Sequence, residues 1–145
     1  MILLIIRYNH FKLNYNLLLF DNLSCEVIHI TNISLNNNNQ YNILPQVIEY
    51  LIRELDPNKI ILFGSCAKGI VKEDSDIDLC VVLKEKMDSK ERANFRSKFL
   101  LDMIDITDYE IDLFICSQEE WDRKHNDLGT FIGKINKEGK ILYGR

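Results

Sequence analysis

The sequence predicts an α/β protein, with a mixed β-sheet of three to five strands flanked by helices. Three apolar runs of strand length lie at residues 59–63, 76–83 and 109–116. Apolar residues recur at helical spacing in two further segments, 43–55 and 89–105. Strand and helix patterns that alternate along one chain are typical of a single sheet with helices packed on it.

The composition agrees with a globular chain that has a real core. The 145 residues are 46% hydrophobic and 28% charged, which is ordinary for such proteins. The formal net charge of −4 argues against direct nucleic-acid binding, which needs a basic surface. No apolar run reaches the ~18–20 residues of a membrane span. The cysteines Cys25, Cys66, Cys80 and Cys116 form no C-x-x-C pair, so we expect free thiols and a cytoplasmic location.

Residues 1–40 differ in kind from the rest of the chain. They are rich in asparagine and contain no Gly, Ala or Pro. We therefore expect an N-terminal extension of unknown role at 1–40 and a folded domain at 41–145. Two interpretations of the extension stay open, an added or mis-started leader and a genuine hairpin packed on the core.

The first elements of the domain follow from local signals. The helix at 43–55 has Pro45 in its first turn and is stopped by Asp56-Pro57. A short buried strand, 59–63, leads into Gly64-Ser65, where a short helix is expected to run to Val71. Glycine lets the backbone approach a ligand closely. A helix start offers free N–H groups, so this bend suits a phosphate.

The next strand carries two carboxylates. Side chains alternate across a strand, so Asp76 and Asp78 point to one face while Ile77 and Leu79 point to the other. Like charges roughly 6–7 Å apart repel each other. A divalent cation between them would turn this repulsion into coordination, and oxygen ligands favour a hard ion such as Mg²⁺.

A third strand, 109–116, carries further carboxylates. Asp112 stands in an apolar run, and burying an unpaired carboxylate there would cost several kcal/mol, so we expect it to need a partner or a cation. Glu110 is the competing residue on the same face, nearer the end of the strand. Downstream, Ser117 is expected to start a helix, with Trp121 in the core and His125 on the surface.

These residues carry a resemblance. Gly64-Ser65, ten residues and then Asp76-x-Asp78 resemble the signature of the DNA polymerase β-type nucleotidyltransferase superfamily. The fuller pattern, with Ala67-Lys68-Gly69 and Ser75-Asp76-Ile77-Asp78-Leu79, is similar to the minimal nucleotidyltransferase (MNT) domains. Those domains are antitoxins paired with HEPN-domain ribonuclease toxins. The family usually has Arg at the position of Lys68.

The resemblance implies a polymerase β-like fold and a Mg²⁺-dependent adenylyltransferase. Asp76 and Asp78 would bind Mg²⁺, and Asp112 would complete a site for a second ion and act on the attacking hydroxyl. Gly64, Ser65 and Lys68 would hold the phosphates of ATP. The acceptor would be a tyrosine of a HEPN toxin that forms a hetero-oligomer with the chain. The alternatives are an antitoxin that only masks its partner, an enzyme acting on a small molecule such as an aminoglycoside or on a nucleic-acid 3′ end, and a nucleotide sensor.

Overall fold

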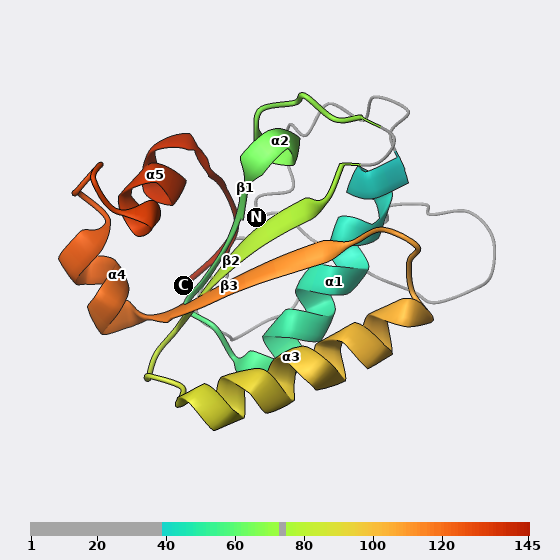
Figure 1. Cartoon of the computed structure of the whole chain (residues 1–145), viewed down its shortest axis with the longest axis horizontal. Helices are drawn as coiled ribbons and strands as arrows, with labels where there is room; N and C mark the ends of the chain where they lie inside the picture. Colours follow the sequence, from blue (N-terminus) through green and yellow to red (C-terminus); the bar gives the residue numbers. More distant parts are fainter. Residues whose placement is uncertain (1–38, 73–74) are drawn as a thin grey trace, which may run out of the picture.

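The structure is a computed structural model that describes residues 39–72 and 75–145 (Figure 1). The two interpretations of the N-terminal extension fall on residues 1–40. All of these except Asn39 and Gln40 lie outside the described part, so both interpretations stay predictions.

Within the described residues, four strands form one mixed sheet, as predicted. In chain order they are β1 (Lys59–Phe63), β2 (Ile77–Leu83), β3 (Ile111–Ser117) and β4 (Lys140–Gly144). Their spatial order is β3-β2-β1-β4. The central strand β1 is antiparallel to both of its neighbours, whereas β2 and β3 are parallel. A parallel pair needs a crossover connection, which α3 supplies.

Two pairs of helices cover the two faces of the sheet. The helices are α1 (Asn39–Leu55), α2 (Gly64–Ala67), α3 (Ser89–Ile104), α4 (Gln118–Lys124) and α5 (Phe131–Glu138). Helices α1 and α3 lie together, and α4 and α5 lie at the other side, with α2 at the end of β1 (Figure 1). This three-layer arrangement buries both faces of the sheet.

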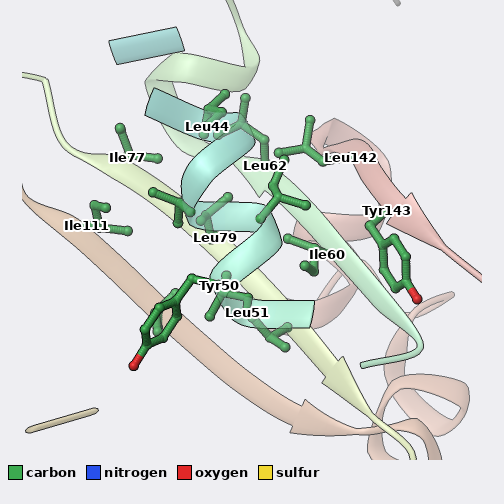
Figure 2. Close-up of a cluster of buried hydrophobic side chains, with 14 of the residues drawn as sticks. Leu44, Tyr50, Leu51, Ile60, Leu62, Ile77, Leu79, Ile111, Leu142 and Tyr143 are labelled. Carbon is green, nitrogen blue, oxygen red and sulfur yellow. The ribbon is translucent and has the colours of Figure 1, made fainter. Parts of the chain in front are cut away.

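The larger core lies between the sheet and helices α1 and α3. Leu44 and Leu51 of α1 pack against Ile60, Leu62 and Leu79 of the strands (Figure 2). All five side chains are essentially inaccessible to solvent. Full burial of such a side chain stabilises the fold by about 1.5–3 kcal/mol, so this face anchors the sheet.

The smaller core lies on the opposite face, beneath α4 and α5. Trp121 of α4 and Ile132 and Ile135 of α5 pack against Ile61, Cys80, Val82 and Cys116 of the strands. The thiol of Cys80 is hydrogen-bonded to Cys116 and buried, and both effects raise its pKa. These cysteines are free thiols, as expected, and act as small core residues.

Helix α2 is shorter than the sequence suggested. It ends at Ala67 rather than near Val71, because Lys68 caps it and Gly69 then takes a positive φ of 73°. Strand β2 begins at Ile77, so Asp76 lies just before the strand instead of inside it.

Helix α3 begins at a capping box, in which Asp88 and Glu91 satisfy each other's backbone N–H groups. Its arginines reach the outer edge of β3, where Arg96 donates to the carbonyl of Leu113 at 2.8 Å and Arg92 to that of Ile115 at 3.4 Å. This part of the basic helix therefore protects an edge strand. Within the described ranges, no helix has the length and apolar character needed to cross a bilayer.

Candidate active site

Two carboxylates stand side by side at one end of the sheet. The strand register places Phe63, Asp78 and Asp112 in one row, on β1, β2 and β3. Adjacent strands lie about 4.8 Å apart, and residues paired across them point to the same face. Asp78 and Asp112 therefore face the same space, on the side of the sheet that α4 and α5 cover lower down.

Within this row, Asp78 is the carboxylate whose pKa is raised. Its side chain is partly buried, and burial is the main reason that its pKa is raised, followed by repulsion from Asp112 and then from Asp76. Both of the other predicted carboxylates thus act on Asp78. Repulsion of this kind is relieved when a cation binds.

Asp76 is exposed and sits in a segment that other elements fix. The Sγ of Cys66 in α2 donates to the Asp76 carbonyl at 3.2 Å. Gln40 of α1 donates to the carbonyl of Lys72 at 2.8 Å, at the start of the same loop. Tyr41 of α1 in turn donates to the Cys66 carbonyl at 2.8 Å. Sequence patterns do not reveal these supporting contacts, because they join segments far apart in the chain.

Asp112 differs from the expectation in its burial. It was predicted to be buried within an apolar run, but its side chain is exposed because it lies at the start of the edge strand β3, away from the core under α4 and α5. The desolvation argument for a cation at Asp112 was therefore wrong. Glu110, the competing residue, is also exposed and precedes β3. Of the two, only Asp112 contributes to the raised pKa of Asp78.

Gly64 touches the carboxylate row directly. It has a φ of 67°, and a Cβ added there would lie 2.0 Å from Oδ2 of Asp78. Any other residue would both strain the backbone and displace that carboxylate. The bend after β1 is thus fitted against Asp78, which explains why glycine stands at this position.

Ser65 and Lys68 lie close by in different surroundings. Ser65 is half-buried in α2, which is too short to carry much of a helix dipole. Lys68 is exposed, and its Nζ lies 2.7 Å from Oε2 of Glu138 at the end of α5. A phosphate would have to compete with this ion pair for Lys68.

A hollow of about 360 Å³ opens beside the carboxylates. It wraps around the edge of β3, from the carboxylate face to the side of α3. The residues that line it are Phe63, Asp78, Arg96, Phe99, Leu100, Ile111, Asp112, Leu113, Phe114 and Phe131. The three phenylalanines on the carboxylate face were not identified from the sequence, because Phe in an apolar run looks like ordinary core.

The donor set fits a hard divalent cation in its chemistry. Among residues 39–72 and 75–145, no three His, Cys, Asp or Glu side chains already stand together as a ligand set. Asp78 and Asp112 are nevertheless neighbours, and Asp76 acts electrostatically on Asp78. Carboxylate oxygens without nitrogen or sulfur ligands favour Mg²⁺ or a similar ion.

The fold and the carboxylate row define a class of enzyme that transfers nucleotides. The profile of the family described as polymerase beta, nucleotidyltransferase, matches residues 45–145. The chain belongs to this family and is a nucleotidyltransferase. A comparison with curated proteins gave no match.

Solved structures with a similar fold include a protein from Sulfolobus solfataricus that is provisionally assigned as a nucleotidyltransferase. It is 20% identical to this chain, with a TM-score of 0.50, and the match covers 72% of this chain and 79% of that one. A toxin–antitoxin complex with AMP-PNP matches at 25% identity and a TM-score of 0.47, covering 70% and 74%. A tri-AMPylated Shewanella oneidensis HEPN toxin in complex with its MNT antitoxin matches at 23% identity and a TM-score of 0.43, covering 74% and 73%. Such identities speak for the fold alone.

Proposed function

We propose that this nucleotidyltransferase transfers AMP from ATP to a tyrosine of a HEPN-domain ribonuclease toxin and thereby acts as its antitoxin. The observation that carries the enzymatic part is the pairing of Asp78 with Asp112 across β2 and β3, with Gly64 packed against Asp78. Nothing in the packing of the sheet requires two neighbouring carboxylates there. Their mutual repulsion is relieved if a cation binds between them, alone or together with a phosphate.

The carboxylates have separate roles in this proposal. Asp76 and Asp78 would hold one Mg²⁺, and Asp112 would help to hold a second. When bound, Mg²⁺ neutralises charge on the phosphates and stabilises the entering and departing oxygens. Asp112 also orients the acceptor hydroxyl and accepts its proton, for which its exposed position at the sheet edge is suitable.

The transfer is a substitution at the α-phosphorus of ATP. The acceptor oxygen forms a bond to this phosphorus, while the bond to the oxygen that bridges to the β-phosphate breaks and pyrophosphate leaves. Gly64 and Ser65 would hold the β- and γ-phosphates through backbone N–H groups and the hydroxyl. Lys68 would contribute charge once it releases Glu138.

The proposed partner and acceptor rest on the motif at Gly64–Gly69 and Ser75–Leu79, which resembles that of the MNT antitoxins. AMP on a tyrosine adds bulk and negative charge. If that tyrosine lies at the toxin's active site, both effects would oppose the binding of an RNA phosphate there.

An acceptor protein could approach over the edge of β3. Leu100, Leu101 and Ile104 of α3 form an exposed apolar stripe, with 57%, 68% and 69% of their surface accessible. Leu100 also lines the hollow that contains Asp78 and Asp112. Because exposed apolar stripes mark interaction sites, this one favours a protein acceptor. It equally supports a second candidate function, in which the chain masks the toxin by binding alone.

The experiment combines the purified chain with Mg²⁺, ATP and the protein that the neighbouring gene encodes, which we expect to have a HEPN domain. We expect mass spectrometry to find AMP on a tyrosine of that protein, and its RNA cleavage to stop. Asp78→Asn and Asp112→Asn should abolish both effects without preventing complex formation. Leu101→Glu should weaken the complex while ATP binding by the chain stays unchanged.

The outcomes separate the two candidate functions. If both carboxylate variants neutralise the toxin as well as the wild type does, the chain acts by masking. If the wild type modifies a small molecule and never the neighbouring protein, the proposed acceptor is wrong.

A further inference from the structure

Three phenylalanines form an aromatic cluster beside Asp78, and one of them, Phe63, pairs with Asp78 across β1 and β2. Phe131 makes edge-to-face contacts with Phe63, at 5.6 Å between ring centroids, and with Phe114, at 5.1 Å. Phe63 belongs to β1 and Phe114 to β3, and these strands flank β2. A ring that packs against both must lie over β2, on the face from which Asp78 projects.

The packing of α5 on the sheet does not require the Phe131 side chain. The helix is anchored by Ile132 and Ile135, which are both 2% exposed, whereas Phe131 keeps 53% of its surface accessible. Thr130 accepts a hydrogen bond from the N–H of Gly133 at 3.0 Å and so fixes the first turn. Phe131 is therefore an exposed ring held in a defined orientation by two aromatic partners.

This ring lines the same hollow as Asp78 and Asp112. The hollow has a volume of about 360 Å³, which lies within the range of small-molecule sites, roughly 300–1,000 Å³. One end of the hollow is anionic and suits a metal-bound phosphate. The other end is aromatic and suits a flat ring joined to that phosphate.

We propose that Phe131 is the stacking platform for the base of the donor nucleotide and that the site prefers purine over pyrimidine nucleotides. This inference rests on the proposed nucleotidyl transfer. In that reaction the leaving pyrophosphate lies toward Gly64 at β1, and the acceptor oxygen lies toward Asp112 at β3. The ribose and base must therefore extend from the α-phosphate in the remaining direction, along the face of β2. Phe131 lies over this face.

The preference follows from what else lines the hollow. Among the described lining residues the polar side chains are Asp78, Asp112 and Arg96, and Arg96 donates to the Leu113 carbonyl. No amide or hydroxyl side chain of that set is available to read the hydrogen-bonding edge of a base. Recognition therefore depends on ring area, which is larger for purines. ATP and GTP should bind alike, and both more tightly than CTP.

The test measures binding to the full chain, with Ca²⁺ in place of Mg²⁺ to suppress turnover. The ligands are ATP, GTP, CTP and inorganic tripolyphosphate. We expect wild-type protein to bind ATP and GTP at least about tenfold more tightly than tripolyphosphate, as one base stacked on an aromatic ring allows. Phe131→Ala should remove this advantage and leave tripolyphosphate binding unchanged, while Phe131→Trp should keep it.

Leu128→Ala is the matched control. Leu128 is also 53% exposed and lies three residues away, but it does not line the hollow. It should leave all four affinities unchanged. Equal melting temperatures of the variants would show that each one is folded.

Several results would overturn the inference. One is an unchanged ratio of ATP to tripolyphosphate affinity in Phe131→Ala. Another is a Phe131→Ala variant that binds ATP as tightly as wild type but no longer transfers AMP to the acceptor protein. The ring would then contact the phenol of the acceptor tyrosine and not the base. If wild-type protein binds neither ATP nor tripolyphosphate, the proposed nucleotidyl transfer itself fails, and the inference with it.

Discussion

Replacing Gly64 with alanine should weaken binding at the proposed metal site while the protein stays folded. The new Cβ would lie 2.0 Å from Oδ2 and 2.8 Å from Cγ of Asp78, where ordinary contacts begin at 3.4 Å. The carboxylate must therefore retreat by more than 1 Å. Rotation of the Asp78 side chain costs the fold little, but it moves an oxygen away from the proposed metal site.

Gly69→Ala provides the matched control, because Gly69 also has a positive φ of 73° but would meet nothing within 4 Å. Both substitutions force alanine into the left-handed region, at a cost of about 1–2 kcal/mol each. Their losses of unfolding free energy in urea should therefore agree within about 1 kcal/mol. Only Gly64→Ala should weaken Mn²⁺ binding, by about 10- to 100-fold, the range found when a residue that orients a metal ligand is changed.

Mn²⁺ binding is followed by electron paramagnetic resonance, which needs neither acceptor nor turnover. The reasoning is refuted if Gly64→Ala binds Mn²⁺ as tightly as wild type. It is also refuted if Gly69→Ala loses as much affinity as Gly64→Ala, because backbone strain and not the contact with Asp78 would then be the cause.

Three further predictions address the charges and the smaller core. Folding raises the pKa of Asp78, so its ionised form destabilises the fold above its folded pKa, and this penalty is absent below the unfolded pKa of about 4. Asp78→Asn should therefore stabilise the metal-free protein at pH 7 by about 1 kcal/mol, which is the repulsion expected between two solvent-screened charges, on Asp78 and Asp112, at the spacing of neighbouring strands. A melting temperature below that of the wild type would contradict this. Lys68→Ala should weaken ATP binding severalfold, whereas Glu138→Gln, which frees Lys68, should leave it equal or up to about fivefold tighter; titration calorimetry of both variants checks this, and weaker binding in Glu138→Gln would argue against a phosphate role for Lys68. Trp121→Ala should cost about 3–5 kcal/mol in urea unfolding because it empties the core under α4, and a loss below 1 kcal/mol would show that α4 is dispensable.

The strands and the long helices could be predicted because their signals are local. Apolar runs and helical spacing identified β1, α1 and α3 within a few residues of their observed limits. Alternation along β2 also placed Ile77 and Leu79 correctly in one core, opposite Cys80 and Val82. These properties depend only on neighbouring residues in the chain.

The surroundings of the site could not be predicted, since they depend on which strands are neighbours. Asp112 lies at the start of β3, away from the core under α4 and α5, so it is exposed where an apolar run suggested burial. Lys68 pairs with Glu138, which is distant in sequence and brought close by α5. The position of Phe131 over β2 likewise depends on how α5 packs on the sheet, which the sequence does not reveal.

The central claim is that the row formed by Asp78 and Asp112 supports attack on the α-phosphate of ATP. It is tested most directly by incubating the chain and the protein encoded by the neighbouring gene with Mg²⁺ and ATP labelled at either the α- or the γ-phosphate. We expect the α-label to appear on the partner, the γ-label to leave as pyrophosphate, and both Asp78→Asn and Asp112→Asn to be inactive. Transfer of the γ-label, or undiminished α-labelling by either variant, would contradict the account.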